Sequence, residues 1–101
     1  MTNINVKPQI AFLSKELKKL DLEVTNLDDE KTLLNLSKIV KKSKEFKNWS
    51  LPNAQIRYIG EILIALEFNV NKTIETLNEV SYFVEIETFI DPELLTETKV
   101  E

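Results

Sequence analysis

The sequence predicts an all-α fold, a small antiparallel helical bundle of about four helices. Four segments space their apolar residues by threes and fours, which is the pattern of an amphipathic helix. The chain has only one glycine and three prolines among 101 residues, so it offers few tight turns. Its length suits one domain, and we expect a single helical domain over 1–101 with a frayed tail at 96–101.

The first helix is expected over about 8–20. Pro8 suits an early helical position, because the N–H that proline lacks has no intrahelical partner there. The apolar stripe that follows consists of Ile10, Leu13, Leu17 and Leu20.

The second helix is expected over about 27–46. Asp28, Asp29 and Glu30 place carboxylates in its first turn, and lysines crowd its other end. Acidic residues at the start and basic residues at the end of a helix complement its macrodipole. This explains the paired carboxylates of Asp28 and Asp29 without a metal or an acid–base role.

A break at 48–53 separates the second helix from a third, expected over about 51–67. Ser50 is a predicted N-cap, and Pro52 falls in the first turn. The third helix has the broadest apolar surface, so we expect it to be central and most buried. Gly60 lies in its middle, where glycine costs about 1 kcal/mol relative to alanine. We therefore expect another helix to approach closely at Gly60.

The fourth helix is expected over about 71–89, capped by Asn69 or Asn71. Its second half allows an alternative. Residues 82–90 are rich in β-branched and aromatic side chains, and Glu85 and Glu87 alternate there with apolar neighbours. The segment 82–90 therefore remains open between the end of a helix and a strand.

Charge is distributed unevenly along the chain. Residues 1–66 hold eleven Lys/Arg and eight Asp/Glu, a balance of +3, whereas residues 67–101 hold two and nine, a balance of −7. The simplest structural interpretation is that the two zones attract each other inside the bundle or across a homodimer.

The residue types that are missing exclude several kinds of chemistry. Without histidine and cysteine there is no imidazole base, no thiolate and no Cys/His zinc site. One glycine leaves no phosphate-binding loop. We therefore expect a non-enzymatic protein with no cofactor and no metal. No secretory signal or membrane-spanning apolar run is visible, so the expected location is cytoplasmic.

The acidic C-terminal third is the strongest functional feature of the sequence. It predicts a protein-binding regulator or inhibitor that presents carboxylates to a basic surface of a partner protein. The predicted partner-binding residues are Glu75, Glu79, Glu85 and Glu87.

A basic patch near the end of the second helix supports two alternative functions. It consists of Lys38, Lys41, Lys42, Lys44 and Lys47. Beside the rings of Phe46 and Trp49 these lysines could bind nucleic acid, or they could hold an immunity-type helical bundle at an anionic membrane. Nucleic acid ranks below a protein partner because the whole chain is acidic.

Residues 61–77 have the residue pattern of a helix-turn-helix motif, with a short turn between two helical segments. Glu75 would place a negative charge in the recognition helix, and phosphates would repel it. In that motif Asn69 would have to replace the glycine that the turn often holds. We therefore interpret the segment as an αα-hairpin of the core. In size and helix number the chain is similar to bacteriocin-immunity bundles and to small acidic inhibitors from mobile elements. These similarities supply classes of hypothesis only.

Overall fold

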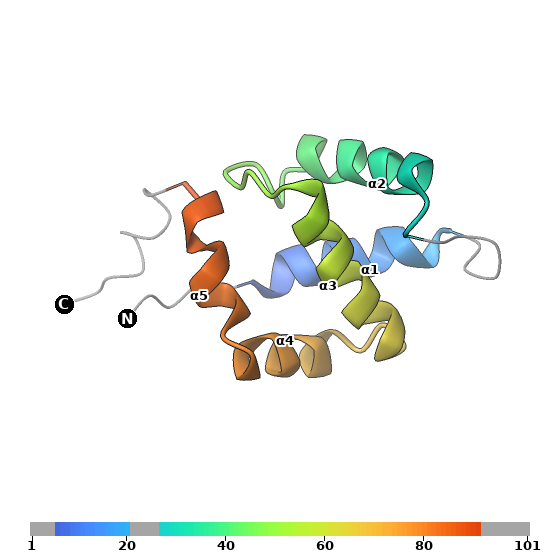
Figure 1. Cartoon of the computed structure of the whole chain (residues 1–101). Helices are drawn as coiled ribbons and strands as arrows, with labels where there is room; N and C mark the ends of the chain where they lie inside the picture. Colours follow the sequence, from blue (N-terminus) through green and yellow to red (C-terminus); the bar gives the residue numbers. More distant parts are fainter. Residues whose placement is uncertain (1–5, 21–26, 92–101) are drawn as a thin grey trace.

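The computed structural model describes residues 6–20 and 27–91, and this part of the chain is helical (Figure 1). Its elements are α1 (Lys7–Lys18), α2 (Glu30–Lys42), α3 (Asn53–Ala65), α4 (Val70–Glu79), α5 (Tyr82–Ile86) and the 3₁₀ turn η1 (Glu87–Phe89). The predicted all-α bundle is confirmed. The tail predicted at 96–101 lies outside the described residues.

α3 is the central element of the bundle. It packs against α1, α2 and α4, and Figure 1 shows it crossing α1 steeply on its way from α2 to α4. Its buried residues are Ile56, Ile59, Gly60 and Leu63. The broad apolar surface of this segment is thus explained, because a helix with three neighbours must be apolar on most of its circumference.

A single apolar core joins the helices. Its most completely buried apolar side chains come from all five helices: Ile10, Leu13, Leu17, Leu36, Val40, Ile56, Ile59, Leu63, Leu77 and Ile86. The stripe predicted for the first helix supplies three of them.

The close approach expected at Gly60 is present, although a side chain makes it rather than a helix backbone. A Cβ at position 60 would lie 2.8 Å from Leu27 Cδ1 and 3.7 Å from Leu17 Cδ1. Leu27, which precedes α2, is 3% exposed. Because Gly60 has no side chain, the Leu27 side chain can pack directly against the backbone of α3.

α2 ends four residues before the predicted boundary. Ser43 adopts an extended backbone with φ −76° and ψ 152°, which stops the helix. Its hydroxyl donates to the Val40 carbonyl at 2.7 Å and accepts from the Phe46 amide at 3.3 Å. The resulting turn directs Phe46 into the core, where its ring meets Trp49 edge-on with centroids 5.3 Å apart.

The single helix predicted over 71–89 is wrong, because the chain breaks between α4 and α5. Ser81 takes the left-handed conformation with φ 59°. Leu77 and Tyr82, five residues apart, would lie about 140° apart around a continuous helix. Both are buried, and the break at Ser81 lets both reach the core. Burial of Tyr82 therefore outweighs the cost of the strained turn.

The alternative strand over 82–90 is also wrong for most of its length. Residues 82–89 are helical, and only Ile90 forms an isolated antiparallel bridge, with Trp49. Two backbone hydrogen bonds hold it: Ser50 N–H to the Phe89 carbonyl at 2.6 Å and Asp91 N–H to the Asn48 carbonyl at 2.8 Å. The bridge ties the end of the described chain to the turn after α2.

Candidate functional site

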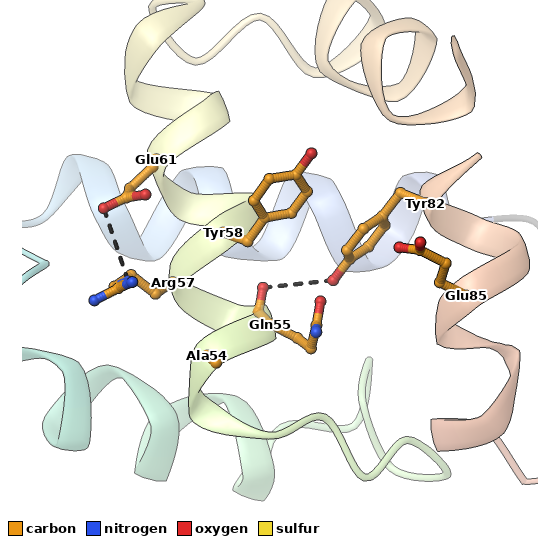
Figure 2. A pocket seen from close by; sticks show the side chains of 7 residues that line it. All are labelled: Ala54, Gln55, Arg57, Tyr58, Glu61, Tyr82 and Glu85. Carbon is orange, nitrogen blue, oxygen red and sulfur yellow. Dashed lines mark hydrogen bonds and ion pairs between the residues drawn. The ribbon is translucent and has the colours of Figure 1, made fainter. Parts of the chain in front are cut away.

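A pocket of about 420 Å³ lies between α3 and α5 (Figure 2). α3 contributes Ala54, Gln55, Arg57, Tyr58 and Glu61, and α5 contributes Tyr82 and Glu85. Only the break at Ser81 allows α5 to stand beside α3 in this way (Figure 1). The pocket is therefore a product of the tertiary fold rather than of one helix face.

Two tyrosines form the inner wall of the pocket. The rings of Tyr58 and Tyr82 lie with centroids 5.1 Å apart at an interplanar angle of 32°. Tyr82 is 2% exposed, whereas Tyr58 is 39% exposed and presents ring surface to solvent. The Tyr82 hydroxyl donates to the Gln55 carbonyl at 3.5 Å (Figure 2). Burial, with smaller contributions from Tyr58 and Glu85, raises the pKa of Tyr82, so this phenol stays neutral.

Charged side chains surround the tyrosine pair. Arg57 lies 3.9 Å from Glu61 (Nε to Oε2), and it lies 3.4 Å from Asp28 (Nη1 to Oδ1). Glu85 stands across the pocket on α5 (Figure 2). Since all four residues are exposed, the pocket is a polar, solvent-open site that can exchange ionic partners.

The structure brings some of the predicted acidic residues together and separates others. Glu75 and Glu79 lie one turn apart on α4, both exposed, on the side opposite the buried Thr73 and Leu77. Glu85 lines the pocket, and Glu87 is partly buried in η1. The four predicted residues therefore occupy three elements.

The sequence prediction missed most of the pocket. Glu61, Tyr58 and Tyr82 were not among the predicted site residues, and only Glu85 was. The available signal was a polar face on an otherwise apolar helix, since Tyr58 and Glu61 are three residues apart. That signal marks an exposed face but does not reveal what stands opposite it.

The lysines of the alternative basic patch are all exposed. Lys38, Lys41 and Lys42 belong to α2, and Lys44 and Lys47 follow it. The rings predicted to stack beside them are in the core, with Trp49 8% and Phe46 2% exposed. This patch therefore offers positive charge without those two stacking surfaces.

The acidic and basic helices lie on opposite sides of the bundle. α2 packs mainly against α3, while α4 packs against α1, α3 and α5, and Figure 1 shows α1 and α3 between them. The lysines of α2 and the carboxylates of α4 therefore do not meet, but α1, which belongs to the same basic zone as α2, packs directly on α4, so attraction between the two zones stays a prediction. The sequence asymmetry becomes an asymmetry between two sides of the molecule.

The remaining predicted features have structural roles. Asp29 is the N-cap of α2, and its carboxylate accepts from Thr32 N–H at 3.0 Å and from the Thr32 hydroxyl at 2.9 Å. These hydrogen bonds lower the pKa of Asp29. Pro52, not Ser50, occupies the N-cap position of α3.

The turn between α3 and α4 confirms Asn69 as the predicted cap of the helix that follows. Glu67 and Phe68 take the left-handed conformation with φ 55° and 64°, while Asn69 caps α4 by accepting from Lys72 N–H at 3.0 Å. Asn69 therefore ends the turn and does not supply its left-handed residue. α3 and α4 contact each other as consecutive helices, but α4 packs more extensively on α1 than on α3.

Comparison of the chain with known protein families, curated proteins and solved structures finds no significant match. Within residues 6–20 and 27–91, no group of three or more acidic side chains is placed to hold a metal ion. The helices of this described part are too short or too polar for any of them to cross a membrane.

Proposed function

We propose that this protein is a non-enzymatic regulator or inhibitor that binds a basic surface of a partner protein through its acidic side. The main support is the placement of charge. Glu75 and Glu79 are exposed on α4, and the lysines of α2 lie on the other side of the bundle. Among the described residues, neither carboxylate has an ion-pair partner. Their field is therefore free to act on another molecule.

Such a surface acts mainly on recognition and on the rate of association. Complementary charge steers a partner toward the correct face, and the effect weakens as salt shortens the Debye length from about 8 Å at physiological ionic strength. Binding through α4 should therefore weaken as salt increases.

The test is affinity capture from a lysate of the organism that encodes the chain, with identification of the captured protein. Two variants with opposite charge changes are compared with the wild type: Glu75→Gln/Glu79→Gln on α4 and Lys38→Gln/Lys42→Gln on α2. Both replace exposed charges with an uncharged side chain of similar reach, and circular dichroism checks that both fold. We expect the wild type and the lysine variant to capture a basic protein that the glutamate variant loses.

Equal capture by the glutamate variant would refute the acidic surface. Capture of nucleic acid that is lost in the lysine variant would instead support the alternative through the basic patch.

Self-association through the same charges has a defined geometry. It would place α2 of one copy on α4 of another, and because these helices face opposite ways, the contact is head-to-tail. Such a contact closes into a ring or grows into an open filament, and it does not give a two-fold dimer. Light scattering at about 0.05 M and about 0.5 M salt measures it; a closed dimer at both salt concentrations would contradict this geometry.

A further inference from the structure

We infer that the pocket between α3 and α5 binds an arginine side chain presented by the partner protein. The inference rests on the proposed function and specifies the chemistry of one of its contacts. It is carried by the convergence of an exposed aromatic ring and two carboxylates from different helices around one open pocket.

The aromatic ring is placed to receive a cation. Tyr58 is 39% exposed, and Tyr82, buried behind it at 5.1 Å, supports one face of its ring. Cations are attracted to an aromatic face within about 6 Å, and a planar guanidinium can also stack on it. Because Tyr82 is packed against Phe83 as well, the wall keeps its shape when a ligand enters.

The carboxylates lie on either side of this wall. Glu61 comes from α3 and Glu85 from α5, and Figure 2 shows the tyrosine pair between them. Among the described residues that line the pocket, Arg57 is the only cation, so these residues together carry one net negative charge. Among the described residues Glu85 has no ion-pair partner.

The existing ion pairs of Arg57 are loose. Its distances of 3.4 Å to Asp28 and 3.9 Å to Glu61 exceed the about 2.7–2.9 Å of a charge-assisted hydrogen bond. Glu61 therefore keeps the capacity to accept from an incoming donor. A guanidinium that stacks on Tyr58 could donate two N–H groups to one carboxylate, which a lysine ammonium cannot do with the same planar geometry.

The test is a titration of the ¹⁵N-labelled full chain with Nα-acetyl-arginine amide, followed by NMR. Nα-acetyl-citrulline amide has nearly the same shape without the charge, and Nα-acetyl-lysine amide has the charge without the planar fork. We expect saturable shifts in the amides of 54–61 and 82–86 with arginine. Citrulline should bind at least about fivefold more weakly, since the ionic contribution is lost.

Two substitutions and one matched control locate the site. Glu61→Gln, which removes the carboxylate on the open side of Tyr58, should weaken arginine binding about three- to fivefold, and Tyr58→Leu should weaken it by a similar factor. Glu67→Gln makes the same charge change in the turn after α3, outside the pocket, and should leave the affinity within about twofold. A thermal melt of each variant confirms folding.

Three results would overturn the arginine site: equal binding of citrulline or lysine, shifts centred on α4, or unchanged affinity in Glu61→Gln. The same variants separate this inference from the proposed function. If capture of a basic protein depends on Glu75 and Glu79 but the arginine probe does not bind, the pocket assignment fails and the proposed function stands. If the probe binds in a Glu61-dependent way and no basic protein is captured, the proposed function fails.

Discussion

Replacing Gly60 by alanine should destabilise the protein, and shortening Leu27 should reverse the sign of that effect. The alanine Cβ would lie 2.8 Å from Leu27 Cδ1, whereas carbon atoms pack at about 3.5–4.0 Å. Leu27 is 3% exposed, so its side chain can move only by displacing other core atoms.

Two opposing magnitudes decide the outcome. Overpacking a core costs about 1–3 kcal/mol, and alanine gains about 1 kcal/mol over glycine inside a helix. We expect Gly60→Ala to lower the free energy of unfolding by about 1 kcal/mol in the wild type. With Leu27→Ala the contact is gone, so the same substitution should raise it by about 1 kcal/mol. The two effects therefore differ by about 2 kcal/mol, which a double-mutant cycle resolves.

The assay is urea unfolding followed by fluorescence of Trp49, the only tryptophan, and by circular dichroism. Coincident transitions establish two-state behaviour for all four proteins of the cycle. Leu27→Ala alone should cost about 2–5 kcal/mol. If Gly60→Ala has the same effect within about 0.5 kcal/mol with and without the Leu27 side chain, Leu27 is not the reason for glycine at this position.

Three further predictions concern stability. Asn69→Ala should cost about 1 kcal/mol in urea unfolding because it removes the N-cap of α4, while Asn69→Asp should be close to neutral; equal losses would show that the cap is unimportant. Ile90→Ala should cost about 2–5 kcal/mol because Ile90 is 3% exposed, whereas Val84→Ala, at a position 68% exposed, should stay within about 0.5 kcal/mol; similar losses would contradict the docking of Ile90 beside Trp49. Burial raises the pKa of Tyr82, so above about pH 10 the unfolded chain loses this proton first and stability falls as pH rises. Tyr82→Phe should reduce that loss between about pH 10 and about pH 12, and an unchanged pH dependence would mean that Tyr82 is solvated.

Local sequence patterns were sufficient for the first three helices. The stripe from Ile10 to Leu17 acts within α1, and the cap at Asp29 acts within the first turn of α2, so their effects can be predicted from spacing and helix-end chemistry. The position of Gly60 also predicted crowding correctly. The spacing of apolar residues could not show that the atom closest to Gly60 belongs to Leu27, which precedes it by 33 residues.

The C-terminal part depended on contacts distant in sequence. The left-handed Ser81 is stable because Tyr82 and Ile86 gain burial against other helices, which a periodicity search cannot detect. The bridge from Ile90 to Trp49 is equally non-local. The pocket could not be predicted from the sequence for the same reason, because Tyr58 and Tyr82 come into contact only after the chain has turned at Ser81.

The charge balance could be counted from the sequence, but its arrangement could not. The numbers +3 and −7 suggested mutual attraction. The packing places α2 and α4 on opposite sides of α1 and α3, although α1 and α3 themselves belong to the basic zone. As a result, the lysines of α2 and the carboxylates of α4 lie on two separate surfaces of the molecule.

The most direct test of the acidic binding surface is the dissociation constant of the captured basic protein, measured by calorimetry for three forms of the chain. Glu75→Gln/Glu79→Gln should weaken binding about tenfold near physiological salt, and Lys38→Gln/Lys42→Gln should change it by less than about twofold. The opposite order, with the lysine variant losing affinity and the glutamate variant retaining it, would contradict the account.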